Sequence, residues 1–324
     1  VEEVRDNTSH LCLWCGVSVV GFVITYTAAT PALCRDNHVC AGLQGGHGEK
    51  MFQLAVIGLS VAFVMEISGM VLTFRSAQGL VGVVRNLEYT FIPPVLLCMT
   101  FATLILENLM LLQGAFVHVA ADGVGGTHGR PVYSPITLEW LINVPILLIL
   151  AGNSALNRPI PEVSRPLLVT NIYIIIAWAA FFVPNEPIRW CFIATAFAMY
   201  AWASYDMATW VSNFRATARP DFPARNLRCA LTIGLIVVFF IYGMVYLASL
   251  LDLINPRQEL IFFVTWDLGV KLSFLCAFVG IRASQFYDLL VTLIKNKVLP
   301  VEGVTSPKDL EAQEAQAAEL PLIE

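Results

Sequence analysis

Charged residues are scarce in this sequence. They make up 13% of its 324 residues, whereas about a quarter of an average soluble domain is charged. Hydrophobic residues make up 57% and gather in long runs. A water-soluble protein of this size could not cover its surface with so few charges. The sequence therefore excludes a soluble enzyme and a disordered chain, and it predicts a polytopic membrane protein.

Histidine is also rare, and none of the five histidines has the spacing of a metal site. A two-metal hydrolase needs a cluster of His and Asp ligands, which this sequence does not offer. The glycine-rich stretch 123–129 lacks the Gly-Lys-Ser/Thr ending of a phosphate-binding loop, and we expect it to form an outside turn. No basic face with interleaved aromatic residues indicates nucleic-acid binding. We expect no catalytic residue, no metal site and no nucleic-acid partner in this chain.

Eight apolar segments are each long enough to cross a bilayer, which needs about 20 residues in a helix. Backbone groups in lipid must be satisfied within their own segment, so these segments are predicted to be helices. The fold class is therefore an all-α membrane protein with eight spans. The segments are 10–30, 51–74, 88–113, 133–153, 167–183, 187–211, 228–253 and 259–281.

The distribution of Lys and Arg predicts the orientation. With eight spans both termini lie on one side, and 13 of the 19 Lys and Arg residues fall on that side against five on the other. Positive residues concentrate on the cytosolic side of membrane proteins. We therefore expect a multi-pass protein of the cell membrane with both termini in the cytosol. Its direct partner is the lipid bilayer.

Two cysteines share the first predicted outside loop. Cys34 and Cys40 would lie in an oxidising setting there, which predicts a disulfide. Two free thiols are the alternative, and spacing alone does not decide between them. The remaining cysteines lie in or near spans and are expected to pack as small apolar side chains.

Three charged residues fall inside apolar segments, where a charge is costly and marks a candidate functional site. Lys271 lies near the middle of the last segment, and Asp267 precedes it by four residues on the same helix face. Glu139 lies at a comparable depth in the fourth segment, so two carboxylates can face one cation. A Lys amine condenses with an aldehyde to a Schiff base, which needs a counterion when protonated. A structural Lys–Asp pair lining a polar seam is the alternative.

The motif Asp267-Leu-Gly-Val-Lys271, with Glu139-Trp140-Leu141 and Pro145-Ile-Leu-Leu148 four segments earlier, resembles the microbial (type I) rhodopsins over about residues 51–295. The resemblance implies a seven-helix retinal-binding domain at 51–297. It also implies all-trans retinal on Lys271 as a Schiff base, with Glu139 and Asp267 as counterions. The implied retinal pocket comprises Trp140, Asn143, Pro145, Phe239, Tyr242 and Tyr246. Phe239 and Gly243 depart from the Trp and Pro that are usual in this family.

Other departures concern ion transport. Ile136 replaces the Arg that proton pumps of this family use for proton release, and Leu150 replaces their cytosolic proton donor. Channel members line their second helix with several glutamates, whereas this chain has only Glu88 and Glu107 near the two ends of that segment. Val144 and Asn171 fall about where channels keep a Cys/Asp gate pair. These substitutions disfavour a pump or a channel.

The ends of the chain resemble the enzyme rhodopsins, most of all the rhodopsin phosphodiesterases of choanoflagellates. Residues 1–50 carry an extra leading helix at 10–30, and residues 259–297 contain almost no helix breaker. A continuous helix of that length would span about 58 Å at 1.5 Å per residue and project into the cytosol. Residues 298–324 then form a linker to a cytosolic enzyme domain that this chain does not contain.

The resemblance implies a function for the whole protein. Light absorbed by retinal would regulate a fused phosphodiesterase that hydrolyses cGMP or cAMP, in a homodimer. Three alternatives remain open at this stage. They are the sensor domain of a rhodopsin guanylyl cyclase, a light-driven ion pump or channel, and an eight-helix transporter that binds no retinal.

Overall fold

A computed structural model describes residues 47–77, 92–114, 116–121 and 130–298. The longest elements in this part of the chain are helices. They are α3 (His47–Ala77), α5 (Ile92–Leu112), α6 (Ser134–Ile149), α7 (Ile160–Ala180), α8 (Glu186–Thr217), α9 (Arg225–Leu250) and α10 (Pro256–Val298). A π-helical segment, η3 (Leu150–Ala155), continues α6. Two short strands, β1 (Val117–Val119) and β2 (Pro131–Tyr133), lie between α5 and α6.

Several predictions fall outside the described residues. These are the leading helix at 10–30, the cysteine pair Cys34 and Cys40, Glu88, and most of the linker at 298–324. The eighth span therefore stays a prediction, as do the disulfide and the cytosolic placement of the two termini. The described residues hold the seven later helices.

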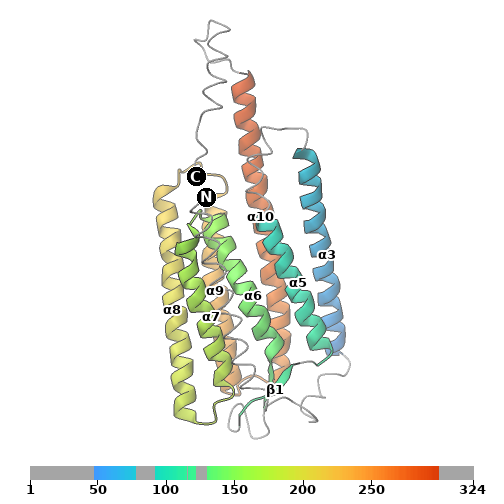
Figure 1. Ribbon diagram of the computed structural model, residues 1–324, viewed down its shortest axis with the longest axis vertical. Coiled ribbons are helices and arrows are strands. Elements are labelled where there is room, and N and C mark those ends of the chain that lie inside the picture. Colours follow the sequence, from blue (N-terminus) through green and yellow to red (C-terminus); the bar gives the residue numbers. More distant parts are fainter. Residues whose placement is uncertain (1–46, 78–91, 115, 122–129, 299–324) are drawn as a thin grey trace.

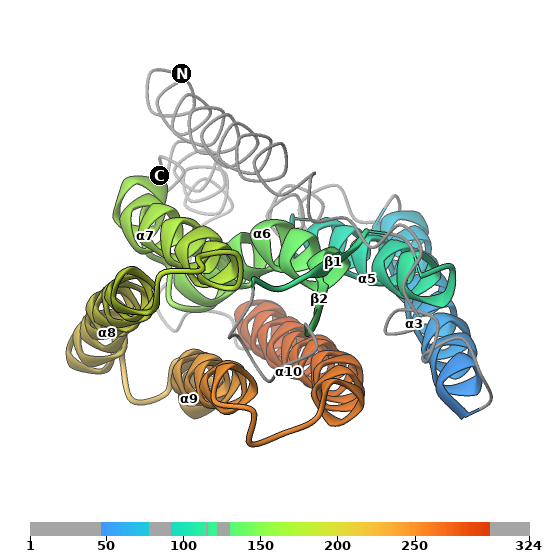
Figure 2. The ribbon, with the colours of Figure 1, turned by 90° about the horizontal axis from the view of Figure 1, so that it is seen from below.

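The seven helices form a ring in chain order. Each packs on the next one along the chain, and α10 also contacts α3 and α5, which closes the ring (Figures 1 and 2). The helices are buried in the bundle to different extents. In the apolar span formed by α6 and η3, 72% is buried, but in that of α3 only 22% is buried. Glu139 on α6 and Asp267 and Lys271 on α10 are buried inside the bundle.

Six helices in the described part of the chain are long and apolar enough to cross a membrane. They correspond to six of the eight predicted spans. Of the other two, the span at 10–30 lies outside the described residues, and the span at 187–211 lies within α8. That segment is helical throughout, but α8 is not among the six. Arg189, Asp206 and Arg215 on α8 lower its hydropathy. The result is an all-helical, multi-pass membrane protein.

Proline positions explain where the helices begin. α5 carries Pro93 and Pro94 in its first turn, and α7 carries Pro161. Proline suits a first turn, because its missing N–H would find no partner within the helix there. The start of α7 at Ile160 precedes the predicted span at 167–183 by seven residues. The helix therefore starts before the long apolar run on which the predicted span was based.

The last helix is longer than any membrane crossing requires. α10 runs without interruption through 43 residues, which is about 65 Å at 1.5 Å per residue. The apolar core of a bilayer is only about 30 Å thick. In Figure 1 the C-terminal end of α10 extends past the ends of its neighbours. The prediction of one continuous helix over 259–297 is confirmed.

The opposite end of α10 is tied to the strands. β1 pairs antiparallel with β2, with Val117 opposite Tyr133. Arg130, just before β2, is buried and donates to Glu259 Oε2 at 2.7 Å and to the Ile254 carbonyl at 2.9 Å. The hairpin thus anchors the N-terminal end of α10. The glycine-rich stretch 123–129 lies within the undescribed residues 122–129.

Candidate functional site

The centre of the site is a lysine–aspartate pair on α10. Asp267 and Lys271 are one helical turn apart, so their side chains meet on one face. The distance from Lys271 Nζ to Asp267 Oδ1 is 2.5 Å. Their exposed fractions are 1% for Asp267 and 2% for Lys271. A charge pair this deeply buried must be compensated locally, because water cannot screen it.

A second carboxylate reaches the same lysine from α6. Glu139 is 2% exposed, and its Oε1 lies 3.2 Å from Lys271 Nζ. Asn143, one turn further along α6, donates its amide N–H to the same Oε1. Asn143 also accepts from the Thr103 hydroxyl at 2.7 Å, which ties this arrangement to α5. The two carboxylates that the sequence places at similar depth therefore face one cation.

Asp267 is held by two further donors. The Trp140 indole N–H donates to Asp267 Oδ2 at 3.1 Å, and the Tyr242 hydroxyl donates to Oδ1. The rings of Trp140 and Tyr242 lie 4.9 Å apart between centroids, and Phe263 packs edge-on against Trp140. Three donors therefore hold the Asp267 side chain in place.

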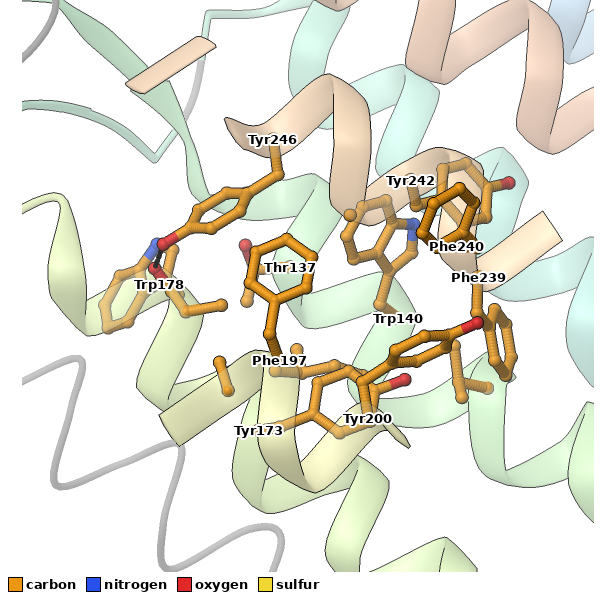
Figure 3. Close-up of a pocket in the computed structure, with 15 residues that line it drawn as sticks. Thr137, Trp140, Tyr173, Trp178, Phe197, Tyr200, Phe239, Phe240, Tyr242 and Tyr246 are labelled. Carbon is orange, nitrogen blue, oxygen red and sulfur yellow. Dashed lines mark hydrogen bonds between the residues drawn. The ribbon is translucent and has the colours of Figure 1, made fainter. Parts of the chain in front are cut away.

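An aromatic pocket adjoins this cluster (Figure 3). Trp140 and Tyr242 lie at one end, and Trp178 and Tyr246 lie at the other. The Tyr246 hydroxyl donates to the Ala177 carbonyl at 2.8 Å, which satisfies its polar atom inside an apolar wall. Residues from four helices line the pocket: Thr137, Trp140, Val144, Tyr173, Ile174, Ala177, Trp178, Ala196, Phe197, Tyr200, Phe239, Phe240, Tyr242, Gly243 and Tyr246.

Four of the six predicted pocket residues line this pocket, and two do not. Trp140, Phe239, Tyr242 and Tyr246 line it, whereas Asn143 and Pro145 are not among its lining residues. The reason is helical spacing, since Thr137, Trp140 and Val144 repeat every three or four residues on one face of α6. Asn143 projects from another face toward α5, where it bonds Thr103. Asn143 therefore does not line this pocket, and its position beside retinal stays a prediction.

Other site residues were not anticipated. Glu107 on α5 is buried, and one of its oxygens lies within 4.8 Å of oxygens of Glu139 and Asp267. The sequence indicates only that Glu107 lies near a helix end. Tyr173, Phe197 and Tyr200, from α7 and α8, were also missed, because aromatic residues on an apolar helix do not differ from ordinary core residues in sequence.

The site fits retinal chemically. An elongated polyene needs an apolar aromatic channel, and its aldehyde needs an amine whose positive charge can be compensated. The described residues provide both, since Trp140 and Tyr242 belong to the pocket wall and also bond Asp267, the partner of Lys271. Gly243 contributes space in the wall, because a Cβ there would lie 3.2 Å from the Phe197 ring.

Comparison with known proteins assigns the family. The family model described as "Bacteriorhodopsin-like protein" matches residues 59–283. The chain belongs to the bacteriorhodopsin-like family. Membership in this family implies a retinal chromophore and agrees with the ring of seven helices. A search of curated protein sequences found no match.

Solved structures of microbial rhodopsins resemble this chain. The transmembrane domain and linker region of Salpingoeca rosetta rhodopsin phosphodiesterase has a TM-score of 0.64 at 15% identity, covering 87% of this chain and 96% of that one. The light-driven proton pump of Leptosphaeria maculans has a TM-score of 0.60 at 17% identity, covering 74% and 97%. The proton pump of Coccomyxa subellipsoidea has a TM-score of 0.59 at 16% identity, covering 72% and 96%. At these identities the likeness shows the fold alone.

Proposed function

We propose that this chain is the light-sensing membrane domain of a rhodopsin phosphodiesterase. All-trans retinal is bound to Lys271 as a protonated Schiff base, with Glu139 and Asp267 as its counterions. One observation carries the proposal, namely a buried amine between two carboxylates beside an aromatic pocket. When bound, retinal supplies the light absorption and the change of shape on isomerisation.

The residues of the chain perform the remaining tasks. Asp267 and Glu139 hold the positive charge in place inside the bundle. Trp140 and Tyr242 are in contact with each other, line the pocket and bond Asp267. Any displacement of these two rings therefore acts on α10 directly. This coupling makes α10 the element that reports a change in the pocket.

Two apolar positions support a sensor over a pump. Ile136 and Leu150 are both buried in the apolar core, and neither can bind or release a proton. Outward pumping in this family relies on an arginine and a proton donor at these positions. Without ionisable groups there, α6 offers no route that reloads and releases a proton in one direction.

The length of α10 supports an output on one side of the membrane. The helix continues to Val298, well beyond the apolar segment that crosses the membrane. To regulate a fused cytosolic domain, α10 needs only two positions whose populations differ between dark and light. The similar Salpingoeca rosetta structure includes a linker region of a rhodopsin phosphodiesterase. We therefore propose a cGMP or cAMP phosphodiesterase as the fused domain.

The proposal includes the setting of the protein. We place the chain in the cell membrane with its C-terminus in the cytosol, on the basis of the Lys and Arg distribution. We place it in a homodimer, because regulated cyclic-nucleotide enzymes work as dimers. Crosslinking at the C-terminal end of α10 in membranes tests the dimer, and protease access to the C-terminal tail in sealed vesicles tests the orientation.

Absorption and enzyme assays test the function. The purified chain with added all-trans retinal is expected to form a visible pigment that light bleaches or shifts. The full-length protein is expected to change its rate of cGMP or cAMP hydrolysis on illumination. Absence of any visible band would refute the photoreceptor function, and a pigment without light-dependent hydrolysis would refute the enzyme assignment.

A light-driven proton pump is the second candidate. It is favoured by the similarity in fold to two proton pumps. Sealed vesicles that contain the pigment are expected to show no sustained pH change on illumination, whereas a steady change abolished by a protonophore would favour the pump.

A further inference from the structure

A third acid lies beside the two proposed counterions. Glu107 on α5 is 3% exposed. One of its carboxylate oxygens lies within 4.8 Å of an oxygen of Glu139 and an oxygen of Asp267. Three acids from α5, α6 and α10 therefore surround one lysine. The proposed function uses only two of them.

The hydrogen bonds are distributed unequally among these acids. Asp267 accepts from Lys271, Tyr242 and Trp140. By contrast, Glu107 Oε2 and Glu139 Oε2 are both buried and have no hydrogen-bond partner in the described part of the chain. A buried polar atom without a partner costs free energy, so native structures rarely leave two such atoms together.

The charges around the cluster do not balance if all three acids are ionised. Within the described residues, the ion pairs of Glu139 and Asp267 both end on Lys271. Ile136 lies one turn before Glu139 and provides no second cation. The buried arginines are engaged elsewhere, Arg130 with Glu259 and Arg228 with backbone carbonyls of Pro223 and Ala155. The partly exposed Arg282 pairs with Glu66. Three carboxylates against one ammonium would leave two uncompensated negative charges inside the bundle, which is strongly unfavourable.

One proton supplies the missing hydrogen-bond donor and reduces the uncompensated charge from two negative charges to one. We propose that Glu107 carries a proton in the dark and shares it with Glu139, so that Glu107 is the third member of the counterion group. The protonated carboxyl of Glu107 becomes a donor, and Glu139 Oε2 becomes its acceptor, either directly or through one bridging water. Glu107 is thus a positioning residue, because it holds Glu139 in its ionised form next to Lys271. Tyr242 and Trp140 remain neutral donors to Asp267.

Infrared spectroscopy of the retinal-free protein tests the proton directly. With glutamate labelled by ¹³C, the protein is expected to show a carboxylic acid C=O band that shifts with the label. This band should be lost in Glu107→Gln. Glu66→Gln is the matched control, because Glu66 is also buried but pairs with Arg282 at 2.7 Å, and the band should remain. A band that persists in Glu107→Gln, or its absence from the wild type, would overturn the proposal.

The pigment provides a second readout, which rests on the proposed function. Glu107→Gln is expected to leave the dark absorption maximum nearly unchanged, because glutamine is neutral and donates as protonated glutamate does. Glu139→Gln should shift the maximum, because an ionised counterion is lost. A shift in Glu107→Gln as large as that in Glu139→Gln would mean that Glu107 is ionised and would refute its assignment.

The two proposals fail in different ways. If the wild type forms no pigment, the photoreceptor function fails, while the infrared band still decides the state of Glu107. If Glu107→Gln does not fold, Glu107→Asp retains an acid, and the C=O band should then no longer shift with labelled glutamate. A glutamate-derived band that remains in Glu107→Asp would exclude Glu107 as the site of the proton.

Discussion

The two halves of α10 are held in different ways. In the N-terminal half, Glu259, Asp267 and Lys271 are all buried and bonded to other elements. In the C-terminal half, Arg282 pairs with Glu66 of α3 at 2.7 Å, and the Arg282 side chain is 25% exposed. The helix then runs on to Val298. The N-terminal half is therefore held by fully buried charges, whereas the charge pair of the C-terminal half is partly exposed.

Under the proposed function, this difference separates detection from output. Breaking a buried, fully bonded charge pair costs several kcal/mol, because the remaining charge is left without a partner. A pair with a partly exposed partner, such as Arg282 with Glu66, costs less to break, because water can reach one of its charges. The N-terminal half therefore keeps Lys271 in one geometry, whereas the C-terminal half can change position at small cost. The following variants test this division.

The largest expected effect is the complete loss of pigment in Lys271→Ala. The buried amine is the proposed attachment point, and alanine cannot form the linkage. Absorption spectroscopy after addition of retinal measures it. Lys50→Ala is the control, because Lys50 is exposed and should leave the visible band intact. A visible pigment in Lys271→Ala would disprove the attachment.

A large loss of stability is expected for Arg130→Leu. The substitution removes the partner of buried Glu259 and should lower the free energy of unfolding by about 3–5 kcal/mol. Thermal unfolding in detergent, followed by circular dichroism, measures it. The double variant Arg130→Leu with Glu259→Leu should recover much of the loss, since no buried charge remains. Equal melting temperatures for wild type and Arg130→Leu would contradict an anchored N-terminal half.

A change in colour is expected when either counterion is neutralised. Excitation moves the positive charge of a bound Schiff base away from the carboxylates, so a counterion lowers the ground state more than the excited state. Glu139→Gln and Asp267→Asn should therefore both absorb at longer wavelength. Asp267→Asn should shift further, because Asp267 lies closer to Lys271 Nζ than Glu139 does, 2.5 Å against 3.2 Å. Unshifted spectra in both variants would exclude the counterion role.

The smallest expected effect on stability is that of Arg282→Gln. Loss of this pair should cost less than loss of the Arg130 pair, because the Arg282 side chain is 25% exposed and that of Arg130 only 1%, and it should leave the dark spectrum unchanged. The response of the full-length enzyme to light should nevertheless change, because the C-terminal half of α10 is released from α3. The charge exchange Arg282→Glu with Glu66→Arg should restore the response. A response unaffected by Arg282→Gln would exclude this contact from the output.

Local patterns in the sequence predicted part of the site well. Asp267 and Lys271 are four residues apart on one helix, so their contact follows from helix geometry alone. The long α10 follows from the scarcity of helix breakers between 259 and 297. Glu139 could be placed at the same depth as Asp267 by counting residues from the span ends.

Contacts that depend on helix rotation could not be predicted in this way. Glu107 faces Glu139 only because α5 packs beside α6 with that side turned inward, and a single sequence does not specify this rotation. The same limit explains Asn143, which was expected in the pocket but faces α5. The strands β1 and β2 were missed because three residues each are too few for an alternating pattern.

The attachment of retinal to one lysine is the central claim, and reductive trapping tests it most directly. Borohydride converts a Schiff base to a stable amine, so digestion of the reduced pigment yields a retinyl-labelled peptide that mass spectrometry can identify. We predict that the label is on the peptide that contains Lys271. A label on any other peptide, or no labelled peptide from a coloured protein, would contradict the account.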